Sequence, residues 1–283
     1  MVRMKRCAAG VLAAAVALLA HAQATVLRFA GVEVHGARRD RAELLHGVAM
    51  PPIGDRVAMD AAKIEAVCAD VRDKLAGERF LHVGCAVVAH VEGEAYVVVD
   101  VVEPEDAERI SYPVLQPLDH LKLAERGGER RSEELIACVR GCSQAADRND
   151  ALRFLGRFDW NQAICRATLQ ALDDRDRFVR RQAAALLADH LASCRGPLGT
   201  ARIVDAALRQ IARPSHDDRT AAVDLMHRLA RFAPDIDDER RRRVIAAADT
   251  LAARSVIPLS VGNARSLAGI LRHPPGDTSP GPE

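Results

Sequence analysis

The sequence predicts an α+β protein in which a small βααββ domain at residues 25–103 precedes an all-α domain at residues 132–272. Two observations carry this prediction. Runs of β-branched residues and alternating apolar residues occur before residue 104 and not after it. From residue 132 onward, apolar residues recur at helical spacing in short segments that proline, glycine and aspartate separate.

Residues 1–24 have the three parts of a secretory signal peptide. Basic residues at the start are followed by an uncharged apolar run at 8–20 and by an Ala-x-Ala motif that ends at Ala24. We therefore expect cleavage after Ala24 and a periplasmic or secreted protein. The alternative is a retained membrane anchor, because no charge occurs from Cys7 to Leu27, a length that just suffices to cross a bilayer.

The balance of charge excludes two broad classes of protein. The chain holds 40 Lys and Arg residues and 39 Asp and Glu residues, and residues 1–24 carry three of the basic residues and none of the acidic ones. Cleavage would leave 37 basic and 39 acidic groups, a net charge of −2. This near-neutrality excludes a broadly basic nucleic-acid binder and a polybasic membrane-surface protein. An aromatic content of 3% argues against a stacking platform for sugars or single strands.

The first domain is predicted to contain three strands and two helices. In order, these are a strand at 26–34, helices at 40–46 and 60–76, and strands at 80–91 and 95–103. The longer helix has an apolar stripe at i, i+3, i+4 and i+7 spacing, and Gly77 ends it. A short connection with Gly93 in its tight position joins the last two strands as a hairpin.

One disulfide follows from this arrangement. The odd positions of strand 80–91 are apolar, so this face should pack on the apolar stripe of helix 60–76. Cys68 lies on that stripe and Cys85 at a core-facing position of the strand, which suits a Cα separation of about 5.5 Å. The alternative is two buried free thiols, which pack well as small apolar groups.

The other cysteines are also expected to form disulfides. Removal of Cys7 leaves an even number in an oxidising compartment, and 15 connectivities are possible for six cysteines. These six are Cys68, Cys85, Cys138, Cys142, Cys165 and Cys194. Pairs Cys138–Cys142 and Cys165–Cys194 are allowed, and so are the crossed pairings. Cys138 and Cys142 could alternatively bind zinc, but no second ligand pair completes a tetrahedral site.

Residues 25–103 resemble a POTRA domain, a small periplasmic module found ahead of outer-membrane assembly and secretion barrels. The matching features are, in order, Val32-Glu-Val-His-Gly36, Glu43-Leu-Leu45, Gly54, Leu75-Ala-Gly77 before Phe80, and Val101-Val-Glu103. The resemblance implies a βααββ fold and a role among proteins of the cell envelope.

Every segment of the second domain is predicted to be helical. Helices are expected at 132–142, 148–158, 160–172, 176–193, 200–213, 217–232, 237–254 and 263–271. Breaks are expected at Gly196-Pro197 and Pro258, among other places. A polar linker at 104–131 precedes the helices, and we expect a disordered tail at 273–283.

Two of these helices suggest a repeat. Segment 181–187 aligns with segment 219–225, a period of 38 residues, since 225 − 187 = 38. Residues 177–187 resemble the second helix of a HEAT repeat. The resemblance implies a stack of helix pairs with a protein-binding surface. The alternative is an irregular helical bundle.

No catalytic, cofactor-binding or metal-binding residue is predicted. The sequence contains no H-E-x-x-H motif, no G-x-S-x-G motif and no phosphate-binding glycine loop. His82 and His90 share one face of a strand, but at eight residues apart they would be about 25 Å from each other. They are therefore expected to face solvent and not to share a metal ion.

These observations favour a non-enzymatic periplasmic adaptor that binds protein partners of the cell envelope, in envelope assembly or secretion. We expect an extended partner segment to add to the free edge of strand 80–91, because this edge carries no protective lysine or proline. The predicted partner-binding residues are His82, Gly84, Ala86 and Val88, through their backbone and beside helix 60–76. No nucleic acid and no membrane span after signal cleavage is expected. The alternatives are a thiol-dependent or hydrolytic enzyme on the helical domain, and a membrane-anchored scaffold.

Overall fold

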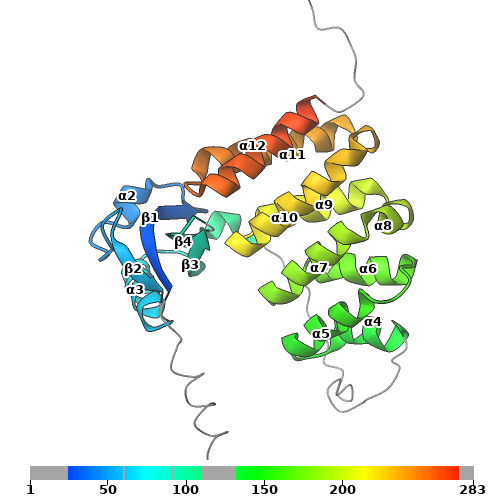
Figure 1. Ribbon diagram of the computed structural model, residues 1–283, viewed down its shortest axis with the longest axis horizontal. Helices are drawn as coiled ribbons and strands as arrows, with labels where there is room; N and C mark the ends of the chain where they lie inside the picture. Colours follow the sequence, from blue (N-terminus) through cyan, green and yellow to red (C-terminus); the bar gives the residue numbers. More distant parts are fainter. Residues whose placement is uncertain (1–24, 60, 91, 110–131, 274–283) are drawn as a thin grey trace, which may run out of the picture.

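The computed structural model describes residues 25–59, 61–90, 92–109 and 132–273 (Figure 1). The predicted signal peptide, most of the predicted linker and the tail beyond residue 273 lie outside the described residues. The α+β prediction is confirmed, because a four-stranded sheet forms in the N-terminal part and the C-terminal part is largely helical. We call residues 25–109 the sheet unit and residues 132–273 the helical unit.

The sheet unit contains four strands in the order β2-β1-β4-β3. Its elements are β1 (Thr25–His35), α2 (Arg41–Leu44), β2 (Arg56–Met59), α3 (Ala61–Leu75), β3 (His82–His90), β4 (Glu94–Val102) and the 3₁₀ helix η1 (Pro104–Arg109). Strand β4 runs parallel to β1 and antiparallel to β3, and β2 is antiparallel to β1. Strands β2 and β3 therefore form the two edges of the sheet.

Strand β2 was not predicted from the sequence. Its four residues pair with the start of β1, with Thr25 opposite Met59 and Arg28 opposite Arg56. The turn before β2 is tied to β1 by two backbone hydrogen bonds, from Gly54 N to Phe29 O and from Phe29 N to Asp55 O, each 2.7 Å long. A strand of this length is too short to show an alternating pattern, and its existence depends on these contacts with β1.

One face of the sheet packs on α3, as predicted. Val97 and Val99 of β4 form a core with Val71 and Leu75 of α3, and each of these four side chains is almost inaccessible to solvent. The disulfide between Cys68 and Cys85 crosses this layer, with a Cα separation of 5.4 Å. This pair confirms the prediction made from helix and strand periodicity.

The opposite face of the sheet packs on the helical unit. Tyr96 and Val98 of β4 form a small core with Ile257, which directly precedes α12. Every residue of β4 is consequently buried. The sheet is the middle layer of the molecule, with α3 on one face and the C-terminal helices on the other (Figure 1).

The helical unit is a stack of helix pairs (Figure 1). Its helices are α4 (Ser132–Gly141), α5 (Ala145–Leu155), α6 (Gln162–Ala171), α7 (Arg177–Asp189), α8 (Leu191–Leu198), α9 (Thr200–Ile211), α10 (His216–Leu229), α11 (Asp238–Arg254) and α12 (Pro258–Arg272). Helices α5, α7, α10 and α12 pack in sequence along one layer, and α4, α6, α8, α9 and α11 form the other. The sheet unit lies beside α10, α11 and α12, and α4 and α5 lie at the far end of the stack.

Several predicted boundaries in this unit are wrong. The helix expected at 176–193 ends at Asp189, because the next residue leaves helical geometry and its ring stacks on Trp160, with 4.1 Å between the ring centroids. The expected break at Pro197 lies inside α8, one residue before its end. The break expected at Pro258 does separate α11 from α12, but the last helix begins at this proline and not at residue 263, because proline is favourable at the first helical position.

A buried arginine links one helix pair to the next. Arg148 donates from Nε and Nη2 to Asp174, at 2.7 and 2.8 Å, and from Nη1 to the carbonyls six and five residues before it. Arg180 repeats this geometry, with Asp218 at 2.7 and 2.5 Å and with the carbonyls at the same two offsets. Each pair is therefore bound to its neighbour by a bidentate ion pair that solvent does not reach.

The sheet unit takes the next place in this series. Arg219 of α10 donates from Nη1 to the carbonyl of Arg213, six residues before it, and to Asp100 of β4. Asp100 is the counterpart of Asp174 and Asp218 in the earlier links. A carboxylate of the sheet thus occupies the place that the carboxylate of a further helix pair would fill, and this contact is one of those that position the sheet unit.

Candidate functional site

The free edge of β3 faces a groove between the sheet unit and the helical unit. Strand β3 has β4 as its neighbour on one side, and no strand of the described chain pairs with its other side. The groove has a volume of about 750 Å³. All four predicted partner-binding residues line it: His82, Gly84, Ala86 and Val88. We call this space the β3 groove.

The opposite wall of the β3 groove consists of the first turns of α7 and α10 and the residues before them. Asp176 caps α7 and accepts hydrogen bonds from the backbone N–H groups of Phe178 and Val179, at 2.9 and 3.1 Å. Ser215 caps α10 and accepts from Asp218 N at 3.3 Å. Both helices therefore direct the positive ends of their dipoles toward the edge of β3.

The backbone groups at the open edge belong to the odd residues of β3. In the parallel β1–β4 ladder, Arg28 N donates to Gly93 O at 2.9 Å. Successive residues of a strand direct their backbone groups to opposite sides, so the odd residues of β4 form hydrogen bonds with β1 and the even ones with β3. The register pairs even residues of β4 with even residues of β3. The N–H and C=O groups of Val83, Cys85 and Val87 therefore point to the open edge.

The predicted residues thus occupy the groove in a different way from the one expected. His82, Gly84, Ala86 and Val88 use their backbone groups toward β4, and their side-chain positions lie on the sheet face that is turned to the helical unit. Gly84 and Ala86 have no side chain or a single methyl group, which leaves space between β3 and the helical unit. Helix α3 flanks β3 on the other face of the sheet.

His82 and His90 lie in different surroundings. His82 is exposed at one end of β3, as predicted. His90 was also expected to face solvent, but neither ring nitrogen is accessible and neither has a hydrogen-bond partner in the described chain. The helical unit covers this end of the strand, where His90 lines a separate cavity of about 160 Å³ with His216 and Arg219.

His216 belongs to both the β3 groove and the smaller cavity. Burial and, to a lesser extent, the charge of Arg219 lower the pKa of His216 below its usual range. The imidazole is therefore neutral at neutral pH and adds no charge to the groove wall.

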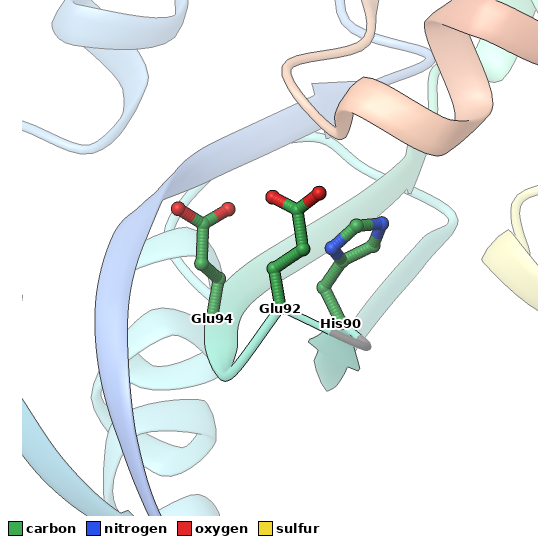
Figure 2. A group of neighbouring side chains, drawn as sticks. All are labelled: His90, Glu92 and Glu94. Carbon is green, nitrogen blue, oxygen red and sulfur yellow. The ribbon is translucent and has the colours of Figure 1, made fainter.

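His90, Glu92 and Glu94 form the one group of three metal-ligand side chains found among the described residues (Figure 2). Their potential ligand atoms lie within 4.8 Å of one another on the hairpin between β3 and β4. However, the carboxylate of Glu94 already accepts hydrogen bonds from Tyr96 Oη, at 2.6 Å, and from Arg28. The hydrogen bond from Tyr96, and then the charge of Arg28, lower the pKa of Glu94. We assign this carboxylate to its contacts with Arg28 of β1 and Tyr96 of β4, within the sheet.

All six cysteines from Cys68 to Cys194 form disulfides. Beside the pair in the sheet unit, Cys138 pairs with Cys142 within α4 and its end, and Cys165 pairs with Cys194, with Cα separations of 4.7 and 5.4 Å. Of the pairings that the sequence left open, these are the uncrossed ones. The thiolates that the zinc alternative required are used in a disulfide, and none of the six is a free thiol.

Sequence reasoning missed two carboxylates that join the units, Asp100 and Glu33. Glu33 of β1 is 1% exposed and accepts hydrogen bonds from Ser255 Oγ at 2.6 Å, from Val256 N at 3.1 Å, and from His35. Burial alone would raise the pKa of Glu33, but these partners, His35 foremost, outweigh burial and lower it to about 2.

A signal for this docking was present in the sequence. The last strand is largely apolar on both faces, since residues 95–99 form a continuous apolar run and only Asp100 separates it from Val101 and Val102. A continuous apolar run of this kind indicates a strand that is buried on both faces. One helix layer covers only one face of such a strand, and in the structure the helical unit covers the other.

Among the residues that the structure describes, no helix is both long and apolar enough to cross a membrane. Three disulfides are compatible with an extracytoplasmic protein. Comparison of the chain with family models, with curated proteins and with solved structures found no match.

Proposed function

We propose that this chain is a non-enzymatic extracytoplasmic adaptor, which holds an extended segment of a partner protein along the open edge of β3. The observation that carries the proposal is the β3 groove, in which an unpaired strand edge faces the N-termini of two helices. We include in this proposal that residues 1–24 are a signal peptide, that the sheet unit is a POTRA-like domain and that the helical unit is a HEAT-like repeat.

The open edge supports strand addition. Outward N–H and C=O groups at Val83, Cys85 and Val87 require hydrogen-bond partners, and a partner strand supplies them in the manner of β-augmentation. Edge strands that do not bind are usually blunted by lysine, proline or a bulge, and the sequence from His82 to His90 contains no lysine or proline.

The size and rigidity of the groove support the same function. Its volume of about 750 Å³ lies within the ordinary range of binding clefts. One wall is fixed to α3 by the disulfide at Cys85, and the other is fixed by the ion pair between Arg180 and Asp218. A preformed groove lowers the ordering cost of binding.

Replacement of Val87 by proline tests this mode directly. Val87→Pro removes an outward N–H group while all bonds from β3 to β4 remain, so the sheet should persist but lose its ability to pair with a new strand. Val87→Ala is the matched control, because it loses side-chain packing and keeps the N–H group. Circular dichroism and detection of the Cys68–Cys85 disulfide by mass spectrometry establish that both variants fold.

Partner capture is measured with a photo-crosslinking amino acid, para-benzoylphenylalanine, at the exposed His82 position. Crosslinked peptides identified by mass spectrometry should map to a short extended segment of the partner. We expect Val87→Pro to lose these crosslinks and Val87→Ala to keep them. Equal crosslinking of the two variants would show that the edge of β3 does not pair with the partner.

A further inference from the structure

The charged side chains that line the β3 groove are not balanced. Three acids line it, and each has a cationic or N–H partner. Asp100 pairs with Arg219, Asp217 lies 3.9 Å from Arg181, and Asp176 accepts two backbone N–H groups of α7. Each of these carboxylates is therefore at least partly neutralised within the protein, most weakly at Asp217.

Three arginines line the same groove, and one of them is used in the fold. Arg180 is bound on both sides of its guanidinium by Asp218. Arg175 and Arg177 are exposed, and no acidic partner for either occurs among the described residues. The guanidinium of Arg177 lies over the ring of Phe178, 4.8 Å from its centroid, which keeps it on the surface beside the groove.

The positive charge lies on one wall only. Both arginines are next to the N-terminus of α7, where the helix dipole adds to their field. The wall formed by β3 carries no ionised side chain from Gly84 to Val88. Acidic side chains are therefore favoured on one side of a bound segment, the side toward α7.

We propose that the segment held in the β3 groove is acidic, with Asp or Glu at alternate positions that face Arg175 and Arg177. This inference rests on the proposed function and specifies its ligand. Residues of an added strand alternate between the two faces of the sheet, so only every second residue is directed to the helical wall. The intervening residues continue the face that is covered by α3, where apolar side chains fit.

Selection from a displayed library of random octapeptides tests this inference. The oxidised chain is immobilised as wild type, as Val87→Pro, and as the double variant Arg175→Gln/Arg177→Gln. The matched control is Arg166→Gln/Arg202→Gln, which removes two exposed arginines of α6 and α9 that do not line the groove. We expect wild type and the control to enrich peptides with alternating acids, and the groove double variant to lose this preference.

Peptides enriched on wild type should bind the groove double variant at least about fivefold more weakly, because two exposed ion pairs with the peptide are lost and each contributes modestly. Enrichment without acidic residues, or an unchanged preference in the groove double variant, overturns the acidic ligand but leaves strand addition intact. Absence of enrichment on wild type, or equal enrichment on Val87→Pro, overturns the proposed function and this inference with it.

Discussion

Arg219 of α10 and Asp100 of β4 form a buried ion pair across the two units, 119 residues apart in sequence, with side chains 6% and 7% exposed. The earlier arginines of the stack find their carboxylates in the helical unit, whereas this one finds its carboxylate in the sheet. The position of the sheet, and with it the width of the β3 groove, therefore depends in part on an arginine–carboxylate pair like those that join the helix pairs, although Arg219 bonds Asp100 through Nη1 alone.

Loss of the carboxylate charge at Asp100 should destabilise the protein strongly. Asp100→Asn leaves the guanidinium of Arg219 buried and uncompensated, and we expect a loss of about 3 kcal/mol in the free energy of unfolding. Asp189→Asn is the control, because it removes the same charge from an exposed pair with Arg228 and should cost less than about 1 kcal/mol. Urea denaturation followed by circular dichroism measures both. Equal losses in the two variants would contradict a special role for Asp100.

The link between Arg180 and Asp218 should be equally important within the helical unit. Arg180→Met leaves a fully buried carboxylate without its partner, which is expected to cost about 3–5 kcal/mol. The adjacent Arg181 is 63% exposed, and its distance of 3.9 Å from Asp217 is long for an ion pair. Arg181→Met should therefore cost less than about 1 kcal/mol in the free energy of unfolding. Thermal unfolding of the two variants measures this difference. Equal melting temperatures for Arg180→Met and Arg181→Met would contradict the importance of the buried pair.

Stability should fall in acid because of Glu33. Its pKa is about 2 in the folded protein and 4.5 in the unfolded chain, so the contribution of the ionised group is complete above about pH 4.5 and is lost as the pH falls toward 2. The difference in pKa corresponds to about 3 kcal/mol. Glu33→Gln should be less stable at pH 6, and its free energy of unfolding should change less between pH 4.5 and 2. If the free energy of unfolding fell equally with pH in Glu33→Gln and in the wild type, Glu33 would not be the cause.

The three disulfides should differ in their contribution to stability. They join cysteines 17, 4 and 29 residues apart, for which chain entropy predicts about 3, 2 and 3.5 kcal/mol, respectively. Double replacement of Cys138 and Cys142 by alanine should therefore be tolerated best, and replacement of Cys165 and Cys194 least. Denaturant midpoints of the three double variants give the order. A largest loss at Cys138–Cys142 would rule out loop length as the main cause.

Local periodicity was enough to predict the features that depend on a single element or on neighbouring elements. The Cys68–Cys85 disulfide and the packing of α3 on one sheet face follow from one helical stripe and one alternating strand. Strand β2 was not predictable in this way, because four residues carry no period and their pairing with β1 is what makes them a strand.

The sequence carried no local signal for which helices pack on the sheet. Ser255 and Glu33 are 222 residues apart, and neither residue type is unusual on a surface. The apolar run of β4 indicates that a second layer exists but not which helices provide it. The candidate site depends on this arrangement, since the sequence indicates an open strand edge and the structure adds the opposing N-termini of α7 and α10.

The docking of the sheet unit on α10, α11 and α12 has a consequence for the order of events during synthesis. The first unit to emerge packs against the last helices to emerge, so contacts such as Glu33 with Ser255 can form only when nearly the whole chain is available. The wall opposite β3 needs α7 and the start of α10, and Arg219 of α10 makes the ion pair with Asp100, so the β3 groove cannot form before that residue has been synthesised. A chain shorter than this has no groove with which to capture a partner.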